Sequence, residues 1–213
     1  MERLSFASLT LSVMTSHKRL KLRQCTNCEC VINGVWEWVE ECARDAAAEE
    51  PAMRGILDDV CLSRNSLATS ISARLARKLS RRDMPRELIE PLIREALTED
   101  QNILSQIAQD LIAIVDRDPA CRTPLEPLLF YKGFHAITTY RISHWLWQHD
   151  RTIMALQFQS LASEVFAVDI HPAATIGCGI LLDHATSFVV GETAIIRDNV
   201  SILHEVTLGG TGK

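Results

Sequence analysis

From Val168 to Lys213 the chain repeats aliphatic residues at intervals of six. An α-helix repeats every 3.6 residues and a strand every two, so this period fits neither element alone. It is typical of hexapeptide solenoids, in which each hexad supplies one short strand and one turn. The pattern therefore predicts a β-solenoid. The aliphatic positions are Ile170, Ile176, Leu182, Val190, Ile196, Ile202 and Leu208.

The repeat slips once, between Leu182 and Val190, which are eight residues apart instead of six. A solenoid can accommodate two extra residues only by bulging a turn outward, and the bulge exposes the side chains that it carries. Here the turn carries Asp183 and His184. A break in the repeat beside an ionisable pair is typical of a functional site, so we expect function in this turn.

The preceding part of the chain, from Val35 to about Phe166, has helical patterns. A helix is predicted to run through Leu79 after a cap at Asn65 or Ser66, because leucine and isoleucine then recur at i, i+4 spacing. Asp100 is expected to cap another amphipathic helix, which the sequence at residues 116–119 ends. Two further helices are predicted at about 134–149 and 152–166.

Prolines divide the remaining helical segments. Pro85 fits the first turn of a helix through Leu97, which Pro91 is expected to kink or divide. Pro124 and Pro127 are expected to keep their segment irregular. The predicted fold class is therefore α+β, with an extension at residues 1–34, an α-helical domain at 35–167 and a β-solenoid at 168–213.

Composition narrows the functional classes. The formal net charge of the 213-residue chain is −5, and this negative charge does not favour binding to nucleic acid. The longest apolar runs are too short to span a membrane, so we expect a soluble protein with no nucleic-acid or membrane partner. Residues 1–24 are basic and rich in serine, threonine and leucine. They fit either an organellar transit peptide or an untargeted extension, so the expected location is the cytoplasm, with a plastid or mitochondrion as the alternative.

The cysteine pattern favours a reducing compartment, because seven cysteines with scattered spacing do not suit a secreted disulfide framework. Cys25, Cys28 and Cys30 have a spacing at which thiolates can share a zinc ion. No fourth ligand or downstream pair is evident, and free thiols in the N-terminal segment are the favoured explanation. We therefore expect no metal.

His184 is the first candidate for chemistry, with Asp169 as its expected partner. Residues about eighteen apart stack in a solenoid whose coil is three hexads, and these two are near that spacing once the slip is included. A carboxylate on one ring nitrogen fixes the imidazole tautomer and leaves the other nitrogen to accept a proton. The pair would then be a general base for a hydroxyl. The alternative for His184 is a histidine in an exposed turn.

Several segments together resemble the serine O-acetyltransferases, a family of hexapeptide-repeat acyltransferases. The resemblance covers roughly residues 35–213. It implies an α-helical domain followed by a left-handed parallel β-helix, and transfer of acetyl from the co-substrate acetyl-CoA to the L-serine hydroxyl in cysteine biosynthesis. The matching segments are Arg117-Asp-Pro-Ala120, Lys132-Gly-Phe134, Arg141-Ile-x-His144-x-Leu-Trp147, Asp169-Ile-His-Pro172, Gly179-Ile-Leu-Leu-Asp183-His184-Ala-Thr186, Val190-Gly-Glu-Thr-Ala194 and Val206-Thr-Leu-Gly-Gly-Thr-Gly-Lys213.

The resemblance also assigns roles to residues. It implies that His184 is the general base, that Asp169 orients it, and that Asp118 and Asp183 face the ammonium group of serine. Taken alone, Asp118 is only a residue that ends a helix before a proline.

The glycine-rich segment at the end of the chain is a further candidate. Gly209, Gly210 and Thr211 would let the phosphate or pantetheine of a ligand approach backbone amides. Flexibility at the end of a chain is the alternative explanation for such a segment.

The resemblance further implies that the chain assembles as trimers paired through the helical domains, and that a C-terminal tail docks into the lyase that forms cysteine.

Three departures from the family pattern bear on these expectations. Ser187 replaces a usual glycine, and serine would be strained if the turn requires a positive φ. Glu205 follows His204 where a small or uncharged residue is usual.

The third departure is the end of the sequence at Lys213, before the family's segment for the serine carboxylate, the later coils and the docking tail. The β-helix is therefore expected to be incomplete at the C-terminus. Two alternatives follow from this reading: a truncated, non-catalytic assembly subunit of the same family, and an acyltransferase for another small acceptor.

Overall fold

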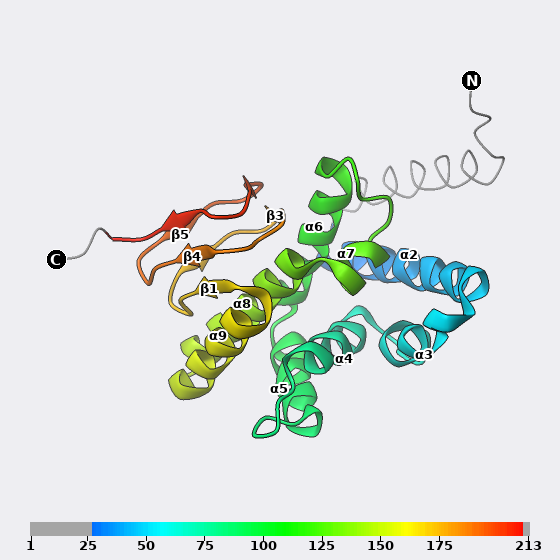
Figure 1. Ribbon diagram of the computed structural model, residues 1–213, viewed down its shortest axis with the longest axis horizontal. Helices are drawn as coiled ribbons and strands as arrows, with labels where there is room; N and C mark the ends of the chain where they lie inside the picture. Colours follow the sequence, from blue (N-terminus) through cyan, green and yellow to red (C-terminus); the bar gives the residue numbers. More distant parts are fainter. Residues whose placement is uncertain (1–26, 211–213) are drawn as a thin grey trace.

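The computed structural model describes residues 27–210 and shows a group of packed helices beside a stack of short strands (Figure 1). The helical part consists of α2 (Cys28–Glu49), η1 (Pro51–Met53), α3 (Arg54–Leu57), η2 (Asp58–Leu62), α4 (Leu67–Leu79), α5 (Arg86–Glu99), α6 (Gln101–Arg117), α7 (Leu125–Phe130), α8 (Lys132–Gln148) and α9 (Thr152–Phe166). The strands are β1 (Val168–Ile170), β2 (Thr175–Ile176), β3 (Leu181–Leu182), β4 (Phe188–Val190), β5 (Ile195–Ile196), β6 (Ser201–Ile202) and β7 (Thr207–Leu208).

The strands form the predicted solenoid. They make three parallel sheets, with the orders β1-β4-β7, β2-β5 and β3-β6. The aliphatic positions of the hexads stack directly on one another: Ile170 on Val190, Ile176 on Ile196, and Leu182 on Ile202. All six of these side chains are buried. The six-residue period therefore marks the interior column of a parallel β-helix.

The two coils differ in length, as the slip in the repeat requires. Val168 pairs with Phe188, twenty residues later, whereas Val189 pairs with Thr207, eighteen residues later. The second spacing is that of three hexads. The first coil holds its two extra residues in the turn between β3 and β4, which contains Asp183 and His184.

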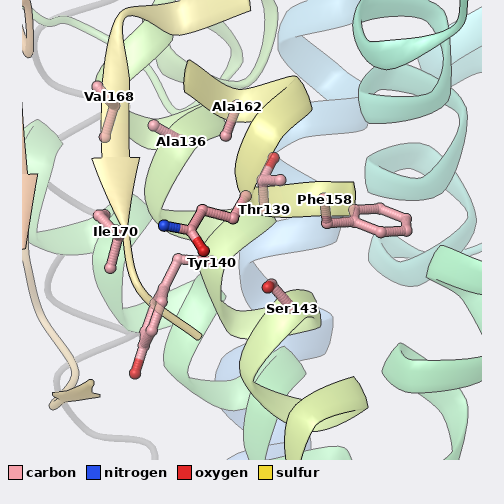
Figure 2. A pocket seen from close by; sticks show the side chains of 9 residues that line it. Ala136, Thr139, Tyr140, Ser143, Phe158, Ala162, Val168 and Ile170 are labelled. Carbon is pink, nitrogen blue, oxygen red and sulfur yellow. The ribbon is translucent and has the colours of Figure 1, made fainter. Parts of the chain in front are cut away.

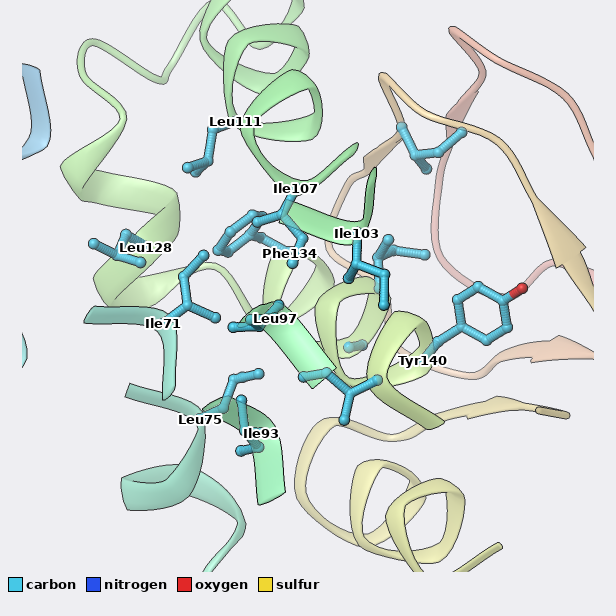
Figure 3. Close-up of a cluster of buried hydrophobic side chains, with 14 of the residues drawn as sticks. Ile71, Leu75, Ile93, Leu97, Ile103, Ile107, Leu111, Leu128, Phe134 and Tyr140 are labelled. Atoms are coloured by element: carbon cyan, nitrogen blue, oxygen red, sulfur yellow. The ribbon is translucent and has the colours of Figure 1, made fainter. Parts of the chain in front are cut away.

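The helical domain is built on one core, to which α4, α5, α6, α7 and α8 all contribute (Figure 3). The predicted stripe of α6 supplies Ile103, Ile107 and Leu111, and that of α4 supplies Ile71 and Leu75. The predicted caps are also present: the Ser66 side chain accepts from the Thr69 amide, and Asp100 accepts from the Asn102 amide.

Three features of the helices differ from the sequence-based expectations. The first helix begins at Cys28, seven residues before the start predicted for the helical domain. Pro91 does not divide α5, which continues through it to Glu99. The segment with Pro124 and Pro127 is not irregular, since it forms α7 with Pro124 at its N-cap. Both prolines lie where a helix has no partner for its amides, so their missing N–H groups break no bond.

The helical domain is joined to the solenoid by buried polar contacts. The side chains of Arg141 on α8 and Asp110 on α6 form an ion pair with a nitrogen–oxygen distance of 2.7 Å, and both are almost fully buried. Arg141 also donates to the Gly177 carbonyl at 2.7 Å, and Asp110 accepts from the Ile180 amide at 2.8 Å. Because one pair binds backbone groups of the solenoid, it fixes α6 and α8 against the first coil.

No helix in residues 27–210 is long and apolar enough to cross a membrane.

The same residues contain no group of three side chains that could hold a metal ion. Of the cysteine cluster, Cys25 lies outside the described residues, Cys28 is an exposed free thiol, and Cys30 is disulfide-bonded.

Candidate active site

The bulged turn of the solenoid faces a pocket at the junction with the helical domain. The pocket has a volume of about 400 Å³ and contains the three residues predicted to act directly on serine: Asp118, Asp183 and His184. Asp118 comes from the end of α6, whereas Asp183 and His184 come from the turn after β3. The remaining lining residues are Ala120, Phe130, Tyr131, Lys132, Gly133 and Leu182.

His184 is presented to solvent by an unusual turn. His184, Ala185 and Ser187 all have positive φ, at 56°, 61° and 59°. Ala185 is fully buried and anchors the turn, while the His184 side chain is 72% exposed. The insertion thus turns the imidazole out of the coil. Ser187 indeed has the positive φ for which a glycine would be favoured.

Two ionisable groups lie beside the His184 imidazole. Its Nε2 atom is 3.7 Å from Oδ2 of Asp183, a contact between neighbours too long for a hydrogen bond. The His204 ring makes an edge contact with the His184 ring, with centroids 5.8 Å apart. His204 was not predicted as part of the site, although its position twenty residues after His184, the spacing of the first coil, was a usable signal.

Asp118 is positioned by the end of α6. Its backbone caps the helix, and its Oδ1 atom accepts a hydrogen bond of 2.8 Å from the Ala120 amide. Tyr131 also lines this pocket. Burial raises the pKa of Tyr131, and the nearby Cys121, Asp118 and Glu126 raise it further, so Tyr131 contributes a neutral phenol.

The first turn of α8 forms the wall of the pocket next to the solenoid. Lys132 donates a hydrogen bond from Nζ to Oγ1 of Thr186, in the bulged turn. A Cβ atom on Gly133 would overlap the carbonyl oxygen of Leu182 and touch Cβ of Ala185. Glycine is therefore required at position 133 for α8 to come this close to the turn.

The expected contact between Asp169 and His184 is not formed within residues 27–210. Asp169 lies on β1 opposite Val189, five residues beyond His184, so the longer first coil moves the two side chains apart. Its Oδ1 atom instead accepts a hydrogen bond of 2.6 Å from Nε2 of Gln159 on α9. Gln159 lines a small cavity between α8, α9 and β1 (Figure 2), and this cavity is separate from the His184 pocket.

The glycine-rich segment also lies away from this pocket. Gly209 and Gly210 are exposed, and a Cβ atom on Gly210 would meet no atom within 4 Å. Packing within the chain therefore does not require glycine there. Thr211 lies outside the described residues.

Comparison with known proteins agrees with this architecture. The family model "Serine acetyltransferase, N-terminal" matches residues 35–139. A probable serine acetyltransferase 4 of Oryza sativa subsp. japonica is 48% identical over 180 residues, which are 84% of this chain and 57% of the rice protein. The soybean serine acetyltransferase complexed with serine is 48% identical with a TM-score of 0.82, over 84% of this chain and 74% of the soybean chain. A serine acetyltransferase in complex with CoA is 44% identical with a TM-score of 0.82, over 83% and 76%.

The β-helix of hexads places the chain in the class of hexapeptide-repeat proteins, and here a helical domain precedes it. Within that class, the chain belongs to the serine acetyltransferase family. It spans 57% of the length of the rice protein that it matches.

Proposed function

We propose that this chain is a serine O-acetyltransferase, which transfers the acetyl group of acetyl-CoA to the hydroxyl of L-serine. The observation that carries the proposal is the pocket that gathers Asp118, Asp183 and His184 from two domains. The complexes of family members with serine and with CoA support the two substrates.

In the proposed reaction, the His184 imidazole removes the proton of the serine hydroxyl. The alkoxide oxygen attacks the carbonyl carbon of the thioester and forms the new ester bond. The carbon–sulfur bond then breaks, and the CoA thiolate takes the proton that His184 carries. A general base positioned in this way contributes about 10²–10⁴ in rate, and the exposure of His184 leaves its ring accessible to a bound hydroxyl.

Asp118 and Asp183 supply the recognition of the amino acid. Two carboxylates in one pocket suit an ammonium group, which forms charge-assisted hydrogen bonds with them. The neutral hydroxyl of Tyr131 adds a donor or acceptor without a competing charge.

The proposed assembly is a trimer built around the solenoid, with trimers paired through the helical domains. Exposed apolar side chains on the outside of the solenoid support the trimer: Val189, Ile195 and Leu203. Cytoplasmic residence is the proposed location, and a plastid or mitochondrion is the alternative that the basic composition of residues 1–24 raises.

The experiment is thiol release from acetyl-CoA with L-serine and with 3-hydroxypropionate, which has the same hydroxyl and carboxylate but no amino group. We expect release that depends on L-serine and is weak with the analogue. Asp118→Asn should reduce kcat/KM for L-serine about 10- to 100-fold, the range for a lost hydrogen bond to a charged group, and should leave the rate with the analogue unchanged.

The control is Asp198→Asn, which removes an exposed carboxylate from the second coil outside the pocket. Equal rates with the two acceptors would contradict recognition of the ammonium group and would favour a different acceptor. Absence of release with any acceptor would contradict the proposed activity of this chain.

A further inference from the structure

The first residue of α8 is tied to the turn that carries His184. Lys132 donates from its ammonium group to the hydroxyl oxygen of Thr186, which lies two residues after His184. This is a contact between the helical domain and the solenoid across 54 positions of sequence. It therefore joins a helix of the domain core directly to the exposed turn.

The turn itself holds an unfavourable backbone conformation. His184 and Ala185 have positive φ, and their backbone conformation costs on the order of 1 kcal/mol or more each for a non-glycine residue. Such conformations persist only where surrounding contacts hold them. The imidazole of His184 forms no hydrogen bond with residues 27–210, so its position depends on the backbone of the turn.

Thr186 is the residue through which the turn is held on both sides. Its carbonyl accepts a hydrogen bond of 2.8 Å from the Glu205 amide in the next coil, and its amide donates to the His184 carbonyl at 2.8 Å. Its hydroxyl oxygen accepts from Lys132, and the same hydroxyl donates to the His184 carbonyl at 3.4 Å. A restraint on the Thr186 side chain is therefore passed directly to the His184 backbone.

The helical side of this contact is rigid. Gly133 packs against the Leu182 carbonyl without room for a Cβ atom, and Arg141, further along α8, is held by the buried pair with Asp110. Lys132 also lines the pocket with Asp118 and Asp183, but in the described part of the chain it forms an ion pair with neither. Its resolved partner is the threonine hydroxyl.

We propose that Lys132 and Thr186 form a latch that fixes the turn of residues 183–187 and so positions His184 for its role as a base. Lys132 is then a positioning residue that acts through Thr186. This inference rests on the proposed function for its kinetic consequence, whereas the latch itself is a structural statement that can be tested without activity.

The structural test is amide hydrogen exchange followed by NMR on the full chain. Lys132→Met removes the ammonium group and keeps the aliphatic stem, and Thr186→Val removes the hydroxyl at constant shape. Each variant should lower the protection of the Ser187 and Glu205 amides about three- to tenfold. The double variant should match Thr186→Val, because that change already removes the contact with Lys132 together with the bond from the hydroxyl to the His184 carbonyl. Thr186→Ser, which keeps the hydroxyl, should retain the protection.

Two controls separate a local effect from a general loss of stability. The Asn199 amide, bonded to the Cys178 carbonyl in the same solenoid, should keep its exchange rate in every variant. Arg197→Met removes an exposed cation of the second coil outside the pocket and should change none of these amides.

The kinetic test uses the same variants in thiol release from acetyl-CoA with L-serine. Both single variants should reduce kcat about three- to tenfold with KM values within twofold of those of the unmodified chain. The double variant should match Thr186→Val. Additive effects, or unchanged protection of Ser187 and Glu205, would overturn the latch. A rise in KM for either substrate on Lys132→Met alone would overturn it in favour of a direct contact between Lys132 and substrate. Loss of protection in a chain that shows no serine-dependent release would support the latch and contradict the proposed function.

Discussion

His184, Ala185 and Ser187 hold a backbone conformation that side chains with a Cβ atom seldom adopt. Their turn is nevertheless anchored, because Ala185 is buried and the Ser187 amide donates to the Ala167 carbonyl at 2.9 Å. Strain of this kind is typical of functional sites, where surrounding contacts over-determine an unfavourable conformation. At the scale of the residue, the extra length of the first coil presents His184 to the pocket in a fixed direction.

His135 on α8 is a histidine with a structural role. It is fully buried beside the rings of Phe134 and Phe166, and Nε2 bonds to the Leu128 carbonyl at 2.8 Å. Since a carbonyl only accepts, the ring is neutral with the proton on Nε2. Burial lowers the pKa of His135 to about 3, and Arg74 and Lys78 oppose protonation as well.

The depressed pKa of His135 predicts how stability depends on pH. The unfolded chain binds a proton at this site below about pH 6.5 and the folded chain does not. Its contribution to the free energy of unfolding is therefore present above pH 6.5 and is lost as the pH falls toward 3. Between about pH 6 and pH 4 the loss should be about 1.4 kcal/mol per pH unit.

The measurement is urea unfolding of the unmodified chain and of His135→Leu from pH 7 to pH 4. Carboxylates titrate in both proteins, so the difference between the two curves isolates the histidine. Leu146→Met, a buried substitution on the same helix that removes no titratable group, is the control and should keep the slope of the unmodified chain. Parallel curves for His135→Leu and the unmodified chain would contradict a neutral buried imidazole.

At the scale of the element, α5 continues through a proline in its interior. Pro91 is the sixth residue of the helix and lies on its exposed side, whereas Ile89 and Ile93 are buried. Water can therefore bond to the carbonyl that lacks a partner. The buried face of the helix holds it in place although the local sequence disfavours it, so Pro91 does not divide the helix.

The exposed position of Pro91 predicts a stabilising substitution. Pro91→Ala should raise the free energy of unfolding by about 1–3 kcal/mol, because it restores an amide donor and removes the clash of the ring with the preceding turn. Urea unfolding measures the difference. Pro85→Ala, at the N-cap of the same helix, is the matched control and should change stability little. A Pro91→Ala chain no more stable than the unmodified one would show that α5 adapts to the proline without strain.

The period of six located the strands, their interior side chains and the bulged turn, because burial in a stacked coil imposes that spacing on the sequence itself. The break in that period also identified Asp183 and His184 as residues of an exposed turn. The end of α6 at Arg117 and the position of Asp118 also followed from the residues around Pro119. Local signals were sufficient wherever one element determined the feature.

Contacts between elements could not be read from the sequence. The approach of Lys132 to Thr186 depends on how α8 docks on β3, which no local pattern records. The pairing of Asp169 with Gln159 depends on the direction in which α9 leads into β1. The left hand of the solenoid was expected from the family resemblance and not from the hexads.

At the scale of the whole molecule, the site is assembled by two domains that are joined through buried polar groups. The helical domain supplies Asp118, Tyr131 and Lys132, and the solenoid supplies Asp183 and His184. The ion pair of Arg141 and Asp110 fixes the junction. The central claim of this account is that His184 acts as the base for serine in that combined pocket.

The most direct test of this claim is the rate of L-serine-dependent thiol release from acetyl-CoA by the unmodified chain and by His184→Gln. The glutamine keeps a polar side chain in the turn but cannot accept the proton. The account predicts measurable release by the unmodified chain and a kcat lower by about 10²–10⁴ in the variant, with far-ultraviolet circular dichroism unchanged. A His184→Gln rate within threefold of the unmodified rate would contradict the assignment of His184 as the base.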